Sequence, residues 1–357
     1  MRFLRRSLAL PLAVALAAAV AMPIAARNIN ANNAYTVNNL VADEPGAAAL
    51  TDPNLVNGWG ITASSSSPWW VVDNETNKST LYRGDGSIVP LVVGVDGGPT
   101  GIVFNGTAGF TVTDGTNTGP ARFIFDTEGG QVLGWNPAVA GGATAILGGE
   151  HPGSNYKGLA LAVAGDSNAY LYAADFHNGA IDVYDSTYAL TSLPGGFTDP
   201  GIPAGFAPFN IQALGGVLYV TYAMQDEEAE DEVAGPGLGY VSAFDTDGNF
   251  IGRVASAGDL NAPWGLAIAP ADFGRFSGDL LVGNFGDGHI NGFGAGDSGW
   301  EAKGHLKTPD HHTLVIDGLW GIGFGNDAGS GPHNVLYFAA GPDDEEHGLF
   351  GSITAGS

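Results

Sequence analysis

Short apolar runs alternate with turn-forming residues along the chain from about residue 34 onward, and no long segment shows a helical period. Three of these runs open with nearly the same phrase, Trp-Gly followed by an aliphatic residue. They are NGWGIT (57–62), APWGLAI (262–268) and GLWGIGF (318–324). Runs of four to eight apolar residues bounded by Gly, Asn and Asp are typical of strands, so the pattern predicts an all-β protein.

Alignment of the chain on this strand gives six similar units. The residues at the position of the repeated glycine are spaced 41 to 57 residues apart: Gly60, Gly101, Gly158, Asn210, Gly265 and Gly321. In each unit a second apolar run ends at a turn former, and third and fourth runs follow. A period near 52 with four strands per unit predicts a six-bladed β-propeller. The four-stranded blades are expected to begin near residues 58, 99, 156, 208, 263 and 319.

The two ends of the chain are predicted to meet in one blade. The sixth unit reaches only its third strand, in LFGSITAGS (349–357), and AYTVNNLVA (34–42) is expected to supply the fourth. That pairing would close the ring and leave no exposed sheet edge. Residues 27–357 are therefore expected to form one domain.

The first 26 residues have a different pattern. A basic start, MRFLRRS, precedes an apolar run that ends in small residues, which is typical of a secretory signal peptide. Export to the periplasm or the extracellular space is the expectation, with an uncleaved membrane anchor as the alternative.

Composition narrows the classes of partner. The chain has 57 Gly, no Cys and a formal net charge of −25, from 37 acidic and 12 basic residues. Such a charge disfavours nucleic acid and anionic membrane surfaces, and without Cys the fold must be held by packing alone. We expect a monomer whose partner is a glycan, another polymer or a protein.

The residue before each repeated glycine is expected at the mouth of the central channel; we call these six positions the lip. They are Trp59, Thr100, Lys157, Phe209, Trp264 and Trp320. Two interpretations of the large side chains remain open. They wedge neighbouring blades apart, or Trp59, Trp264 and Trp320, with Lys157 and Phe209, form a stacking platform for a sugar or another flat ligand.

Polar residues at the ends of the second strands are expected on the same face as the lip. Asp73, Asp126, Asp175 and Asn284 offer oxygen atoms from four blades, which suits Ca²⁺. The alternative is that they are ordinary turn residues that accept local hydrogen bonds. Two acidic insertions, Gln225–Gly237 and Gly341–Gly348, are expected to be mobile, solvated loops on this face. His177, His289 and His347 belong to separate blades, so a Zn²⁺ site is not expected there.

Several phrases resemble a known family. YKGLALA and LYAADFHNGAIDVYD, together with NGWGI and LNAPWGLAIAP, resemble exported bacterial proteins of unknown function, some of which carry a C-terminal sorting signal. The blades more loosely resemble NHL-repeat propellers. The resemblance implies a six-bladed propeller and export, but no activity.

Three functions compete on this evidence. The leading hypothesis is a non-catalytic binding or scaffold module that acts through the rim of Trp and Asp residues. The second is a metal-dependent hydrolase, lactonase-like, or a lyase with its site in the channel. Lactonase-like propellers place a metal-binding glutamate on the first inner strand, where this chain has Asn57, and that difference counts against the lactonase. The third is a structural protein of the cell envelope.

Overall fold

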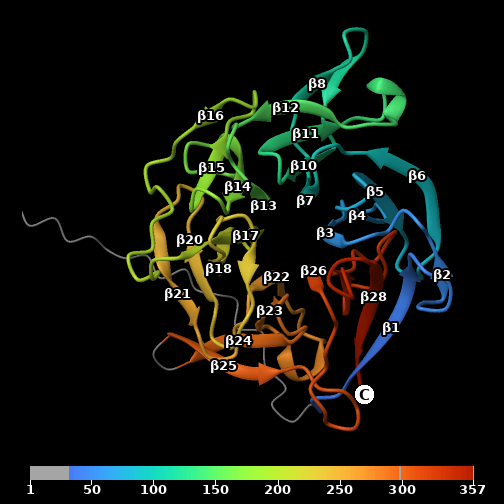
Figure 1. Cartoon of the computed structure of the whole chain (residues 1–357), viewed down its shortest axis with the longest axis vertical. Coiled ribbons are helices and arrows are strands. Elements are labelled where there is room, and N and C mark those ends of the chain that lie inside the picture. Colours follow the sequence, from blue (N-terminus) through green and yellow to red (C-terminus); the bar gives the residue numbers. More distant parts are fainter. Residues whose placement is uncertain (1–31, 297–298, 357) are drawn as a thin grey trace, which may run out of the picture.

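The computed structural model describes residues 32–296 and 299–356, and it is a ring of six small sheets around a central axis (Figure 1). The predicted six-bladed β-propeller is confirmed. Each blade starts with a strand beside the axis. These inner strands are β3 (Gly58–Thr62), β7 (Pro99–Phe104), β13 (Tyr156–Val163), β17 (Phe206–Leu214), β22 (Pro263–Ile268) and β26 (Leu319–Phe324).

The other strands of each blade follow outward and run antiparallel to their neighbours. The second strands are β4 (Trp69–Asp73), β10 (Phe123–Thr127), β14 (Ala169–Asp175), β18 (Val217–Gln225), β23 (Leu280–Asn284) and β27 (Val335–Ala340). The third strands are β5 (Lys78–Tyr82), β11 (Gln131–Trp135), β15 (Ala180–Tyr184), β20 (Tyr240–Phe244), β24 (Ile290–Gly296) and β28 (Leu349–Ala355). The outer strands are β6 (Ile88–Gly94), β12 (Ile146–Glu150), β16 (Leu190–Thr191), β21 (Phe250–Ser256), β25 (Gly299–His305) and β1 (Tyr35–Ala42).

The sixth blade is closed by the start of the chain, as predicted. Strand β1 pairs antiparallel with β28, in a register that runs from Tyr35 opposite Ala355 to Ala42 opposite Leu349. Because β1 covers the outer edge of β28, the third strand of the last blade is paired on both sides.

A few short strands and helical turns lie outside the four main strands of the blades. Strand β2 (Leu50–Thr51) pairs with β1, and β19 (Glu232–Val233) pairs with β18. Strands β8 (Thr111–Thr113) and β9 (Thr118–Pro120) form a hairpin within the second blade. The helical segments η1 (Ala140–Gly142) and η2 (Gly274–Phe276) are single turns. Among the described residues, no helix is long and apolar enough to cross a membrane.

The repeated Trp-Gly phrase marks a β-bulge in the inner strand. In β3, Gly58 pairs with Asp73 and Ile61 with Val71, so Trp59 and Gly60 together face a single residue of β4. The other five blades shift register at the same place. A bulge bends its strand and redirects one side chain, and in each blade it lies at the lip residue.

The glycine of the phrase permits close contact with the next blade. A Cβ on Gly60 would lie 2.5 Å from the carbonyl oxygen of Thr100, and one on Gly321 would lie 2.7 Å from that of Trp59. Both distances are shorter than van der Waals contact, so a side chain here would push two blades apart. In the one unit without this glycine, the side-chain amide of Asn210 donates a hydrogen bond to the Trp264 carbonyl at 2.8 Å.

Candidate functional site

Aromatic side chains from the lip close the centre of the ring. Trp320 is stacked between Trp59 and Phe285, with ring centroids 3.8 and 3.9 Å away, and Trp264 meets its edge at 5.9 Å. Phe209, from the far side of the axis, lies 5.7 Å from Trp320. These rings come from blades one, four, five and six, so they contact one another across the axis. We call this group the aromatic plug.

The indole N–H groups of the plug differ in their partners. Trp264 donates to the carbonyl oxygen of Lys157 at 2.7 Å, and Trp320 donates to Oδ1 of Asn57 at 3.0 Å. Trp59 is 2% exposed, and its Nε1 has no hydrogen-bond partner in the described part of the chain. An unpaired buried donor is costly, which marks Trp59 as the residue of the plug that lacks an acceptor.

In one of the two interpretations, five lip residues form a stacking platform for a ligand; the structure places these residues inside the protein. Trp59, Trp264, Trp320, Phe209 and Lys157 are all buried. Because each tryptophan is covered by neighbouring rings or by the next blade, the arrangement agrees with the wedge interpretation. A role for these five residues in ligand binding stays a prediction.

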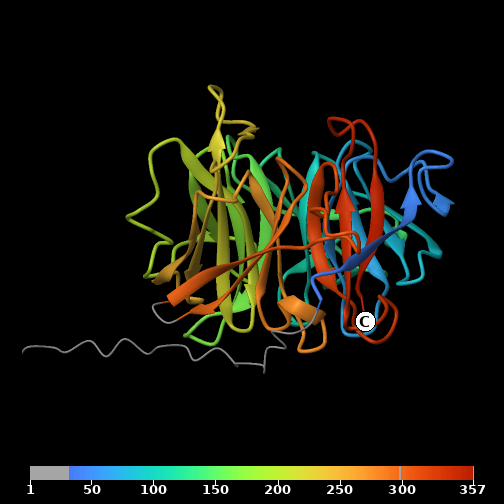
Figure 2. The ribbon, with the colours of Figure 1, turned by 90° about the horizontal axis from the view of Figure 1, so that it is seen from below.

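An acidic pocket lies on the face of the plug where the inner strands begin. It has a volume of about 350 Å³ and is lined by Trp59, Asn74, Glu75, Glu128, Asp231, Glu232 and Glu345. The five carboxyl groups come from the turns that follow the second strands of blades one, two, four and six. Figure 2 shows the two acidic insertions, after β18 and after β27, rising from the same face of the ring.

Lys157 provides the cationic group beside this pocket. Its side chain is 1% exposed, and its Nζ lies 2.6 Å from Glu128 Oε1 and 3.0 Å from Asp231 Oδ1. The ammonium group also lies 5.3 Å from the centre of the Trp59 ring. Burial alone would lower the pKa of Lys157, but the two carboxylates outweigh it and raise the pKa. Lys157 is therefore charged and already engaged.

Two carboxyl groups of the pocket hold protons more tightly than usual. Burial raises the pKa of Glu232 to about 8, although the nearby Lys157 charge opposes it. Burial also raises the pKa of Glu345 to about 7; Glu128 and Asp231 add to the rise, whereas Lys157 and a hydrogen bond from Asn57 oppose it. The Asn57 amide lies 3.0 Å from Glu345 Oε2. With one lysine for five carboxyls, the pocket lacks positive charge.

The acidic insertions were expected to be mobile, solvated loops, and the structure instead folds part of each over the channel mouth. Asp231 pairs with Lys157, and the segment then forms β19 against β18. Glu345 is held by Asn57. Sequence patterns did not reveal these contacts, because each joins residues more than 70 positions apart; the only signal was the acidic character of both insertions.

The four residues expected to gather round a Ca²⁺ ion are not brought together. Asp73 accepts a hydrogen bond from Thr80 at 3.1 Å, and Asp126 accepts one from the Gly101 N–H at 2.6 Å. Asn284 donates to the Asp259 carbonyl. Asp73 and Asp126 thus bond within their own blades, and Asn284 bonds to the loop that leads into its blade. Burial raises the pKa of Asp126 to about 7 and that of Asp73 well above its ordinary value.

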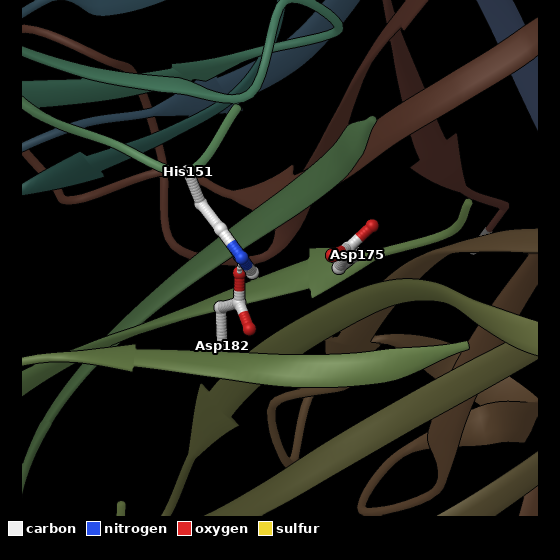
Figure 3. A group of neighbouring side chains, drawn as sticks. All are labelled: His151, Asp175 and Asp182. Atoms are coloured by element: carbon white, nitrogen blue, oxygen red, sulfur yellow. Dashed lines mark hydrogen bonds and ion pairs between the residues drawn. The ribbon is translucent and has the colours of Figure 1, made fainter. Parts of the chain in front are cut away.

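Asp175 is the one member of that set with metal-capable neighbours in the described residues. His151, Asp175 and Asp182 place one possible ligand atom each within 4.8 Å of the others (Figure 3). His151 Nδ1 lies 2.6 Å from Asp182 Oδ2, and the same oxygen accepts a hydrogen bond from Tyr156 at 2.7 Å. Asp175 accepts from the Asn178 side chain at 2.8 Å. Asp182 is thus bonded to His151 and Tyr156, and Asp175 to Asn178, so these side chains have protein partners where blades two and three meet.

The remaining candidates stay apart, as expected for residues of different blades. His347 pairs with Asp43 at 2.9 Å, His289 lies 3.5 Å from Asp287, and His177 faces the Ala229 carbonyl. On the other side of the plug, the channel forms a second cavity of about 280 Å³ with no charged lining residue. The titratable groups of the channel are thus confined to one mouth.

The geometry defines the class: a six-bladed β-propeller whose channel is closed by aromatic rings and whose one mouth is an acidic pocket. The chain is 37% identical over 335 residues to an uncharacterized protein of Acanthamoeba polyphaga mimivirus, covering 89% of this chain and 80% of that protein. A second uncharacterized mimivirus protein is 34% identical over 340 residues, covering 89% and 85%. The chain belongs to the family of these proteins. No model of a known protein family matches it.

Solved structures agree in fold. A Bacteroides thetaiotaomicron protein of unknown function has a TM-score of 0.56 at 11% identity, covering 90% of this chain and 76% of that one. The soluble aldose sugar dehydrogenase of Escherichia coli has a TM-score of 0.51 at 13% identity, covering 90% and 100%. The family relatives are viral, so these comparisons do not support the expected bacterial origin or export. The expected signal peptide, residues 1–26, lies outside the described residues.

Proposed function

We propose that this protein is a non-catalytic binding module that takes a small hydroxylated amine, such as an amino sugar, in the acidic pocket. The observation that carries the proposal is a cavity with five carboxyl groups that is also lined by Trp59, whose buried N–H has no partner among the described residues. Carboxylates favour a ligand with ammonium and hydroxyl donors, whereas Trp59 needs an acceptor, and a hydroxyl oxygen can supply one.

The spacing of the carboxyls favours an organic cation over a metal ion. A Ca²⁺ ion needs six to eight oxygen atoms at about 2.3–2.6 Å. Among the described residues, three acidic or histidine ligands lie within 4.8 Å of one another only at His151, Asp175 and Asp182, outside this pocket. A volume of about 350 Å³ also suits a small molecule. The metal-dependent hydrolase or lyase therefore has less support.

The test compares two sugars that differ mainly in charge. Isothermal titration at pH 6.5 should detect saturable binding of glucosamine, and N-acetylglucosamine, which lacks the cation, should bind at least roughly tenfold more weakly. Glu345→Gln should weaken glucosamine binding by a similar factor, because a bound ammonium group lowers the pKa of Glu345 and so favours its charged form, whereas Gln keeps the shape but cannot carry the charge. Glu346→Gln is the matched control: it lies next to Glu345 in the same insertion but is exposed and outside the pocket lining.

A second comparison isolates Trp59. Trp59→Phe removes only the unpaired N–H and the second ring, so it should weaken glucosamine binding by roughly three- to tenfold. Binding of spermidine, a cation without an oxygen acceptor, should not change. Equal affinity for the two sugars would contradict the proposal. Tight Ca²⁺ binding without binding of either amine would favour the metal-dependent alternative instead.

A further inference from the structure

A third cavity, distinct from the channel cavity behind the plug, lies on the opposite face of the ring, between the first two blades. It has a volume of about 490 Å³ and includes the Ser64–Pro68 segment, which joins β3 to β4. Phe104 at the end of β7 and Trp135 at the end of β11 also line it. Neighbouring strands are antiparallel. The inner strands begin and the second strands end at the acidic pocket, whereas the inner strands end and the second strands begin at this cavity. In Figure 1 these blades are the blue and teal part of the ring.

Aromatic side chains form the floor of this cavity. Trp70 stacks on Phe123 with ring centroids 4.0 Å apart and meets Trp135 at 4.7 Å. All three side chains are largely buried, yet each contributes to the lining. No described residue forms a hydrogen bond with Trp70 Nε1, whereas Trp135 Nε1 donates to the Gly142 carbonyl at 2.9 Å. The floor therefore offers flat apolar surface and one free donor.

Two arginines line the same cavity. Arg83 follows β5 and Arg122 precedes β10; both are exposed, and neither forms an ion pair with any described residue. The chain has 37 acidic and only 12 basic residues, so carboxylates are abundant elsewhere. Arg253, by contrast, pairs with Asp199 at 2.7 Å. Two unpaired guanidinium groups beside aromatic rings form a donor set for an anion with a flat apolar part.

We propose that this cavity binds a small planar aromatic molecule that carries a carboxylate, sulfonate or phosphate group. The ring would lie against Trp70, Phe123 and Trp135, and the anionic group would face Arg83 and Arg122. Because the acidic pocket lies on the other face, its carboxylates are screened from such a ligand at physiological salt. The proposal does not depend on the ligand of the acidic pocket.

The test uses two probes that share a ring system. Fluorescence titration of the full chain with 8-anilinonaphthalene-1-sulfonate should show one saturable site, and the neutral N-phenyl-1-naphthylamine should bind more weakly. The Arg83→Gln, Arg122→Gln double variant should bind the sulfonate roughly tenfold more weakly while binding of the neutral probe changes less than about twofold. Arg275→Gln, which removes an arginine of the fifth blade, is the matched control.

Melting curves separate this site from dye binding to partly unfolded protein. The double variant should melt at the wild-type temperature, because both arginines are exposed and unpaired. Unchanged sulfonate affinity in the double variant, or equal affinity for the charged and neutral probes, would overturn the proposal. Equal loss in Arg275→Gln would also overturn it, since the effect would then follow net charge rather than this cavity.

Discussion

At the scale of single residues, a difference of two positions along the chain decides whether an acidic residue lines the pocket. Asp73 is the last residue of β4 and Asp126 the last but one of β10, and both bond within their own blades, whereas Glu75 and Glu128, in the turns that follow, line the pocket. Residues two positions apart within a strand would face the same side, so it is the turn after each strand that directs Glu75 and Glu128 toward the mouth. Lys157 then joins carboxylates of two blades.

The pH dependence of stability tests the burial of Glu232 and Glu345. Their pKa values in the folded protein, about 8 and about 7, lie above the ordinary value of about 4.3 in the unfolded chain. The folded state therefore binds more protons between these limits. Each group contributes stability below about pH 4.3 that is lost as pH rises through the folded pKa.

We expect the free energy of unfolding of the wild type to fall between pH 5.5 and 8.5 more steeply than that of Glu232→Gln or Glu345→Gln. The difference should be on the order of 1 kcal/mol for each carboxyl after solvent screening. Urea titrations at three pH values measure it, with Glu228→Gln as the exposed control. Parallel pH profiles of wild type and both variants would show that these carboxyls are not buried in solution.

At the scale of elements, the sequence predicted the strands well because each blade repeats one pattern. The ends of the second strands and the pairing of β1 with β28 follow from turn residues and from counting strands. The bulge in each inner strand was not anticipated, since apolar periodicity does not reveal one extra residue. Trp59 and Trp320 lie at these bulges and stack on each other in the buried plug, an arrangement that neither interpretation of the lip described.

The contacts that shape the pocket escaped prediction for another reason. Lys157 meets Asp231 and Asn57 meets Glu345 across 74 and 288 positions of the chain, and only the closed ring brings them together. The acidic residues of the two insertions indicated negative charge at this mouth, but they did not reveal the conformation that the insertions adopt. His151 likewise lies in the loop between blades two and three, 31 positions before Asp182, so its network had no sequence signal.

The glycine of the repeated phrase allows a direct test of blade contact. Gly321→Ala should destabilise the protein by roughly 1–3 kcal/mol, because its Cβ would lie 2.7 Å from the Trp59 carbonyl oxygen and 3.0 Å from the Ile61 nitrogen. Gly252→Ala, in β21, is the control, since a Cβ there would meet no atom within 4 Å. Chemical denaturation compares the two. Equal stabilities would mean that the blades can separate at the hub without cost.

At the scale of the whole molecule, the propeller is held by packing between blades and by one non-covalent closure. Apolar side chains fill the spaces between adjacent blades, and the axis is filled by the aromatic plug. No cysteine is present to form a covalent tie. Strand β1 therefore fastens the ring: it carries buried Tyr35, whose hydroxyl donates to the Phe273 carbonyl of the fifth blade at 3.0 Å.

Removal of β1 should therefore open the ring. A chain that begins at Asp43 lacks β1, whereas one that begins at Asn32 keeps it and is the matched control. Loss of the buried Tyr35 and Val41 side chains alone should cost roughly 3–6 kcal/mol, and the bare edge of β28 should promote aggregation. A synthetic peptide of residues 32–42 should restore cooperative unfolding by adding the missing strand. If the shortened chain unfolds with the cooperativity and stability of the control, β1 does not close the ring, and packing between the blades suffices.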